Sequence, residues 1–192
     1  MVEQSRQYLS GLMQAVHKNI ERMTEVVAET EYQSLQHFTS HSPWDPQPVM
    51  DQVALDADHA LGGTADSALV LDESSNPKKG KKSVGVARQW CGRLGKVDNC
   101  QTGVYASLVQ GVAATIIACR LYLPKEWTDD RKRCKAAGVP EDVVFQTKSQ
   151  LVLYIVHYVR TLGVRWAWIG LDGGYGKDPH LLKTLDDEGE QF

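Results

Sequence analysis

The sequence predicts an α/β fold in which a mixed β-sheet follows a small helical N-terminal region. Apolar residues recur at helical spacing before residue 62, whereas short apolar runs separated by turn signals dominate after residue 66. A helical pattern at residues 147–162 lies between two strand-like runs, and this order favours a mixed sheet. We therefore predict a helical region at residues 1–64 and a sheet-containing domain at residues 65–192.

Three helices are expected in the N-terminal region. One apolar stripe predicts a continuous first helix and comprises Leu9, Leu12, Met13, Val16, Ile20, Met23 and Val27. Thr30 and Gln33 fit a capping box that starts the second helix. Asp45 and Pro46 fit the first positions of the third helix, which Gly62-Gly63 would end. A helix-turn-helix motif is an alternative, but the acidity of this region argues against DNA binding by this region alone.

Four strands and two helices are expected in the second region. The strands cover residues 67–72, 101–109, 112–123 and 166–172, and Gln110-Gly111 forms a hairpin turn between the middle two. Thr147 can cap a helix that Gly163 ends, and Asp178-Pro179 starts a shorter one. The first and last strands are so apolar that we expect both to be central in the sheet. Residues 76–96 and 124–140 are expected to be irregular.

The net charge of −3 hides an asymmetry along the chain. Residues 1–66 carry 3 Lys and Arg against 10 Asp and Glu, whereas residues 67–192 carry 18 against 14. Most of the local excess is one block: Lys78, Lys79, Lys81, Lys82, Arg88, Arg93 and Lys96. Such a block is a candidate for binding nucleic-acid phosphates. The alternative is a solvated basic loop.

Several function classes find no support in the sequence. No apolar run reaches the roughly 18 residues that a membrane-spanning helix needs, and the N-terminus is polar, so we expect a cytoplasmic protein with no membrane partner. The four cysteines show no C-x-x-C spacing, which favours free thiols over a zinc or redox site. No phosphate-binding loop of the G-x-x-x-x-G-K-[ST] type is present.

Two aspartates are the candidate catalytic residues. Asp72 and Asp172 each close an apolar strand-like run, and glycines follow Asp172. If the two strands are parallel neighbours, both carboxylates emerge side by side at the carboxyl edge of the sheet, where Mg²⁺ or Mn²⁺ could bind. Glu73 and Asp178 are candidate auxiliary acids, and the glycines would let a nucleic-acid backbone approach. The alternative is that both aspartates are ordinary turn residues.

Several stretches of the chain resemble signatures of bacterial insertion-sequence transposases of the DDE type. They are residues 32–38, 42–45, 72–74, 81–101, 121–124 with Trp127, and 170–176. The resemblance covers nearly the whole chain and implies an RNase H-like catalytic domain behind the helical region. It also implies that Asp72 and Asp172 are the first two acids of a catalytic triad that holds Mg²⁺ or Mn²⁺.

The activity implied by this resemblance is DNA transposition through metal-dependent phosphodiester cleavage and strand transfer. Its implied partners are DNA at the transposon ends and a second copy of the chain or the full-length transposase. From their charge alone, Lys78, Lys79, Lys81, Lys82, Arg88 and Arg93 are expected to contact the DNA backbone.

The chain departs from the family pattern at its C-terminal end. The third acid of the triad is a glutamate on a later helix, whereas Glu188 and Glu190 lie too close to Asp172 along the chain to be that residue. We therefore expect an incomplete RNase H-like sheet, a C-terminally truncated transposase and no catalysis by this chain alone. The alternative is a non-catalytic DNA-binding or regulatory fragment.

Overall fold

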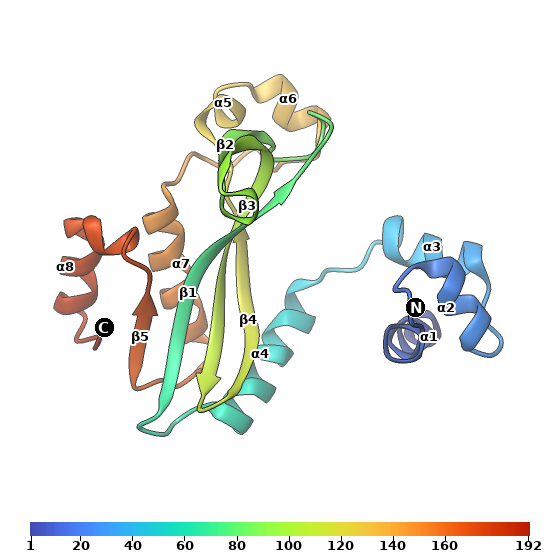
Figure 1. Cartoon of the computed structure of the whole chain (residues 1–192), viewed down its shortest axis with the longest axis horizontal. Coiled ribbons are helices and arrows are strands. Elements are labelled where there is room, and N and C mark those ends of the chain that lie inside the picture. The colour runs from blue at the N-terminus through green and yellow to red at the C-terminus, as the bar shows by residue number, and fades with distance from the viewer. The chain divides into compact units, whose positions relative to one another are not determined.

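The computed structural model describes all residues 1–192, which form two compact units. The first unit is Met1–Pro46 and the second is Gln47–Phe192. Figure 1 shows the helices of the first unit and the sheet of the second. The helix at residues 47–61, which we expected in the N-terminal region, belongs to the second unit because it packs on the sheet. None of the helices combines the length and the apolar character needed to cross a membrane.

The first unit contains the helices α1 (Val2–Gln14), α2 (Ile20–Val26) and α3 (Tyr32–Ser40) around a small core of Ala15, Met23 and Leu35. The prediction of one continuous helix through Val27 was wrong. The backbone becomes extended at Ala15, and the Asn19 side chain accepts a hydrogen bond from the Arg22 amide to start α2. Met13 is consequently 85% exposed rather than buried.

The second unit contains a five-stranded mixed sheet, which confirms the predicted α/β class and is consistent with an RNase H-like domain. Its strands are β1 (Ser67–Pro77), β2 (Ala87–Cys91), β3 (Lys96–Gln110), β4 (Ala113–Leu121) and β5 (Trp168–Leu171). Strand β3 pairs antiparallel with β1, β2 and β4, whereas β1 also pairs parallel with β5. The predicted hairpin between β3 and β4 is confirmed, and Gly111 adopts the positive φ that its turn requires.

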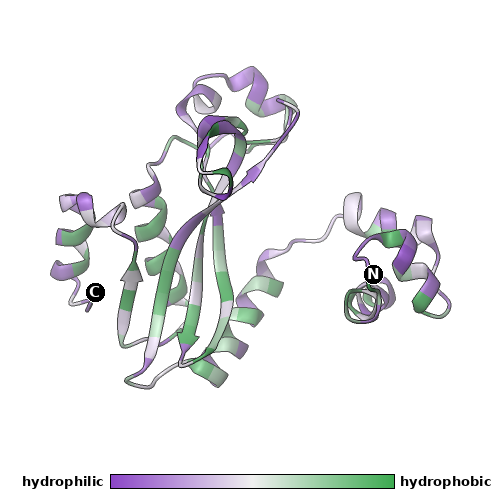
Figure 2. Ribbon diagram, in the orientation of Figure 1, coloured by the Kyte–Doolittle hydropathy of each residue, from purple (hydrophilic) through white to green (hydrophobic).

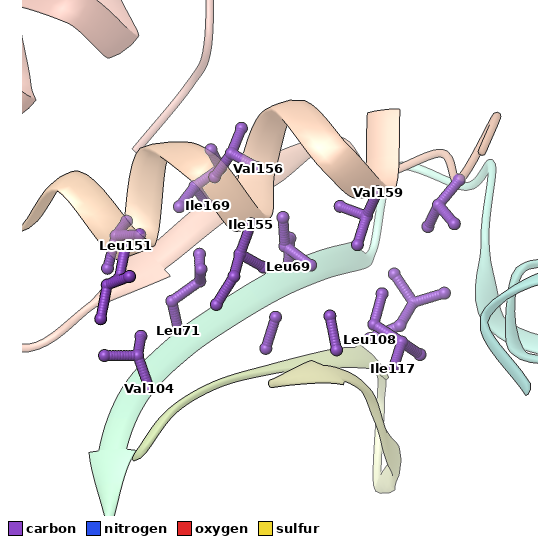
Figure 3. Packing of buried hydrophobic residues seen from close by; sticks show 14 of the residues in the cluster. Leu69, Leu71, Val104, Leu108, Ile117, Leu151, Ile155, Val156, Val159 and Ile169 are labelled. Carbon is purple, nitrogen blue, oxygen red and sulfur yellow. The ribbon is translucent and has the colours of Figure 1, made fainter. Parts of the chain in front are cut away.

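One face of the sheet carries the main hydrophobic core. Helices α4 (Gln47–Leu61) and α7 (Lys148–Thr161) lie on this face, and α8 (Pro179–Asp187) contributes Leu181 and Leu185. Figure 3 shows Leu69 and Leu71 of β1 facing Ile155 of α7. The expected capping box of α7 forms between Thr147 and Gln150, and Asp178 caps α8 as predicted.

Two stretches that we expected to be irregular contain regular structure. Strand β2 lies within the basic segment, and the short helices α5 (Lys125–Thr128) and α6 (Arg131–Ala136) follow β4. Figure 1 shows these elements together at one end of the sheet, and we call residues 78–96 with α5 and α6 the basic lobe. Hydrophilic residues predominate there, whereas hydrophobic residues follow the strands (Figure 2). Trp127 is completely buried in the lobe with Leu123 and Cys134.

Strand β5 lies at an edge of the sheet, and so only the first of the two apolar strands is central. Trp168 on β5 is 43% exposed, although the neighbouring Ile169 is buried. Alternation along the strand explains this difference, because successive side chains point to opposite faces and only one face carries helices. The expectation that both strands are central was therefore wrong for β5.

We expect the packing of α7 on the sheet to dominate the stability of the second unit. Ile155→Ala should lower the free energy of unfolding by about 3 kcal/mol, because the truncation leaves a cavity in a fully buried site. Tyr154→Phe on the exposed side of the same helix should cost less than about 1 kcal/mol. Urea denaturation followed by circular dichroism measures both changes, and equal losses would contradict the prediction.

Candidate metal centre and nucleic-acid interface

The strands that carry the two aspartates are parallel neighbours, as predicted. Leu71 of β1 pairs with Leu171 of β5 at the last position of their register, and Asp72 and Asp172 are the next residues on each strand. Both aspartates are exposed. The arrangement therefore brings two carboxylate-bearing residues to neighbouring positions where β5 separates from β1, which is the kind of sheet edge where ligands bind in α/β proteins.

Asp72 does not end its strand, contrary to our expectation. Strand β1 continues to Pro77, and Asp72 is paired with Tyr105 of β3. The polar run 73–76 gave no strand signal, but its backbone pairs with β3 along its whole length. Asp72 is instead the first residue of β1 beyond its pairing with β5, and its Oδ1 atom accepts a hydrogen bond of 2.7 Å from the Glu73 amide.

Asp172 is held by the turn that follows β5. Its Oδ1 atom accepts hydrogen bonds from the amides of Gly174 at 2.9 Å and Tyr175 at 3.2 Å. A Cβ atom on residue 174 would lie 3.0 Å from the same oxygen, and glycine therefore allows this close approach. Gly173 and Gly176 border open space, so only Gly174 is required by the carboxylate itself.

The two candidate auxiliary acids are occupied by other contacts. Glu73 forms an ion pair of 2.7 Å with Lys148 at the start of α7, and Lys148 also lies over the ring of Tyr122. Asp178 accepts the amide hydrogens of His180 and Leu181 as the N-cap of α8. The hydrogen bond with the Ser149 side chain and then these amide bonds lower the pKa of Asp178. Neither residue joins Asp72 and Asp172 in a cluster of three ligands.

The donor set at the sheet edge fits a hard divalent cation. Backbone amides bind the Oδ1 atoms of Asp72 and Asp172, whereas their Oδ2 atoms form no hydrogen bond within the chain. Mg²⁺ commonly binds through one or two carboxylates while water and substrate phosphates fill its other positions. The two aspartates could therefore hold Mg²⁺ or Mn²⁺, although no third acidic ligand stands beside them.

Tyr175 is the one residue of this region that the sequence did not single out. The residue is only 6% exposed, and its hydroxyl oxygen is buried without a hydrogen-bond partner. Burial raises the pKa of the phenol above its usual range, and the carboxylates of Glu73, Asp72 and Asp172 raise it further. The hydroxyl therefore stays protonated beside three negative charges.

The basic segment presents its cations on a backbone that other residues hold in place. Arg133 donates to the carbonyl of Lys81 at 3.0 Å, and Trp127 donates to that of Val86 at 2.8 Å. Lys79, Lys81, Lys82, Arg88 and Arg93 are exposed and Lys78 is partly exposed, and none of the six forms an ion pair in the structure. The six predicted DNA contacts are thus available to a ligand.

Helix α6 adds cations that we did not predict. Arg131, Lys132 and Lys135 are exposed and line an open hollow together with Val139 and Glu141. Arg133 stacks over Trp127 of α5 with 3.7 Å between the guanidinium carbon and the ring centroid, and its hydrogen bond to the Lys81 carbonyl ties α6 to the basic segment. The run Arg131-Lys132-Arg133 was a visible charge signal, but the sequence did not show that it folds beside residues 78–86.

Glu188 and Glu190 are both bound away from the aspartates. Glu188 accepts hydrogen bonds from His157 and Arg160 on α7, and Glu190 contacts Arg160 and the indole nitrogen of Trp166. These partners help to lower the pKa of Glu188 against the effect of burial. The expectation that neither glutamate completes the acidic site agrees with this placement.

Comparison with known proteins identifies the family. A family model described as DDE superfamily endonuclease matches residues 2–192. The chain is 27% identical over 171 residues to a protein of Microchaete diplosiphon named "Probable transposase for insertion sequence element IS701". That alignment covers 88% of this chain but 42% of the relative, and no solved structure matches the chain. The match over almost every residue shows that this chain belongs to the DDE superfamily endonucleases.

Proposed function

We propose that this chain binds transposon DNA and supplies the first two acidic ligands of a transposase active site. The observation that carries this proposal is the register of β1 and β5, which places Asp72 and Asp172 one step beyond the Leu71–Leu171 pair. The family activity is phosphodiester cleavage and strand transfer, and DNA is its substrate. We also propose a cytoplasmic location, as expected if this chain acts on DNA inside a bacterial cell.

Each residue of the site has a distinct part in this proposal. Asp72 and Asp172 hold Mg²⁺ or Mn²⁺ through the oxygens that the backbone leaves free. A bound ion would stabilise charge on the phosphodiester and activate water or a 3′-hydroxyl. Lys148 offsets the charge of Glu73, which limits the repulsion that an approaching phosphate meets at this edge.

The basic lobe supports the DNA-binding part of the proposal. Strand β1 leads from Asp72 directly into the lobe, and the six residues from Asp72 to Pro77 span about 17 Å. Lys78, Lys79, Lys81, Lys82, Arg88 and Arg93 would neutralise phosphates of a duplex whose cleavage site lies at the aspartates. The cations of α6 extend the same surface.

A second function is supported by the absence of a third acidic ligand that would complete a metal-binding group with Asp72 and Asp172. With two acidic ligands the chain would bind DNA without cleaving it, and it would compete with a full-length transposase for the same ends or enter its assemblies as an inactive subunit. The basic lobe and the helical unit that this role requires are both folded.

We expect the lysines of the basic lobe to dominate the salt dependence of DNA binding. Replacing Lys81 and Lys82 by alanine should weaken binding to a mixed-sequence duplex and reduce the slope of log K against log salt concentration by about 1–2. Fluorescence anisotropy at several salt concentrations measures this slope. Replacing Lys18 and Lys183, which removes equal charge elsewhere, should leave it nearly unchanged. Equal effects of the two pairs would contradict the assignment of the lobe.

We expect no strand cleavage by this chain alone. Incubation with Mg²⁺ and DNA that carries the terminal repeats should leave the DNA intact, because two carboxylates leave one flank of the ion open. A nicking assay on a labelled or supercoiled substrate tests this. Robust nicking that disappears in Asp72→Ala would show that the two aspartates suffice and would favour the catalytic function over the regulatory one.

A further inference from the structure

The hydroxyl group of Tyr175 forms no hydrogen bond with the rest of the chain. It is one of two buried side-chain polar atoms without a hydrogen-bond partner, and the other, Oε1 of Gln4, lies in the first unit. Leaving such a group unpaired costs about 1–3 kcal/mol. The ring of Tyr175 packs in the main core, and phenylalanine would fill that space without the cost. Packing therefore explains the ring and leaves the oxygen unexplained.

The backbone of Tyr175 is part of the acidic site. Its amide donates to Oδ1 of Asp172, so the residue belongs to the turn that orients this carboxylate. The carboxylates of Glu73, Asp72 and Asp172 act electrostatically on the phenol, and Glu73 is already neutralised by Lys148. A protonated phenol on this turn is suited to donate a hydrogen bond to an oxygen that arrives at the site with a bound ion.

We propose that Tyr175 is a positioning residue whose hydroxyl donates a hydrogen bond to an oxygen of the loaded metal centre, either a carboxylate oxygen or a water molecule. This inference rests on the proposed metal site at Asp72 and Asp172. The unpaired hydroxyl is a cost to the metal-free protein, and binding of the ion supplies its partner. Hydrogen bonds donated to metal-ligating groups orient those groups, and losing one such bond weakens metal binding by about 10–100-fold.

The proposal predicts effects of opposite sign for one substitution. Tyr175→Phe should raise the melting temperature of the metal-free chain by about 2–4 °C, because it removes the unpaired buried hydroxyl. The same change should weaken Mn²⁺ binding by about tenfold or more. A hydroxyl that only stabilises the fold would instead lower the melting temperature when removed.

Calorimetric titration of Mn²⁺ into the full chain, together with thermal melts without metal, tests the proposal. Tyr154→Phe is the control, because it removes a phenol hydroxyl from the exposed side of α7; it should leave Mn²⁺ binding unchanged and should not raise the melting temperature. Tyr175→Phe with wild-type Mn²⁺ affinity, or with a lowered metal-free melting temperature, would overturn the role of the hydroxyl.

The variant Asp172→Asn distinguishes a wrong assignment of the Tyr175 hydroxyl from a wrong assignment of the metal site. If Asp172→Asn abolishes Mn²⁺ binding while Tyr175→Phe leaves it intact, the proposed function stands and the inference about Tyr175 is wrong. If the wild-type chain does not bind Mn²⁺, or if Asp172→Asn binds it equally well, the metal site and the role of Tyr175 are both refuted.

Discussion

The parallel pairing of β1 with β5 is the constraint on which the candidate site depends. Helix α7 connects the antiparallel part of the sheet to β5, and its buried face packs against Leu69 and Leu71. The same packing buries Ile169 of β5 and so sets the register in which Leu71 meets Leu171. A slip of one residue would turn the buried side chains of β5 to the opposite face. Core packing, rather than any interaction of the aspartates, therefore brings Asp72 and Asp172 to neighbouring positions.

The electrostatics of the site follow from its local backbone. Each aspartate has one oxygen held by amide hydrogens, which orients the carboxylate without neutralising it. The third nearby acid, Glu73, is neutralised by Lys148. The sheet edge therefore concentrates negative charge at the two aspartates, while the positive charge of the domain collects in the basic lobe. A nucleic-acid backbone meets favourable charge in the lobe and needs a cation at the aspartates.

Local signals predicted the elements that local chemistry controls. The Gln110-Gly111 turn, the Thr147–Gln150 capping box and the Asp178 cap each depend on side chains within four residues, and all three are present. The apolar runs before Asp72 and Asp172 likewise predicted the two parallel strands. The capping box expected at Thr30 and Gln33 did not form, because α3 begins one residue later with Glu31 as its N-cap. The Thr30 hydroxyl instead donates a hydrogen bond to the Ala28 carbonyl.

The remaining features depend on contacts between distant parts of the chain. The polar residues 73–77 are a strand only because β3 pairs with them, and α4 joins the sheet through Ala54 and Ala57 although its sequence is that of any amphipathic helix. The ion pair of Glu73 with Lys148 joins residues 75 positions apart. The isolation of the Tyr175 hydroxyl is likewise a property of its packed surroundings, so no spacing or motif could have revealed it.

The side-chain hydrogen bonds that hold the backbone of the basic segment lower the entropy cost of binding a ligand there. Side chains of Asn99, Gln101, Trp127 and Arg133 bind backbone carbonyls between Lys78 and Val86, so the main chain beneath the lysines is already ordered. A disordered basic arm would lose backbone freedom on reaching DNA, at about 1–2 kcal/mol per residue. Here it is mainly the exposed basic side chains that have freedom left to lose. In the proposed complex, electrostatic attraction therefore contributes to DNA binding without the cost of ordering this backbone.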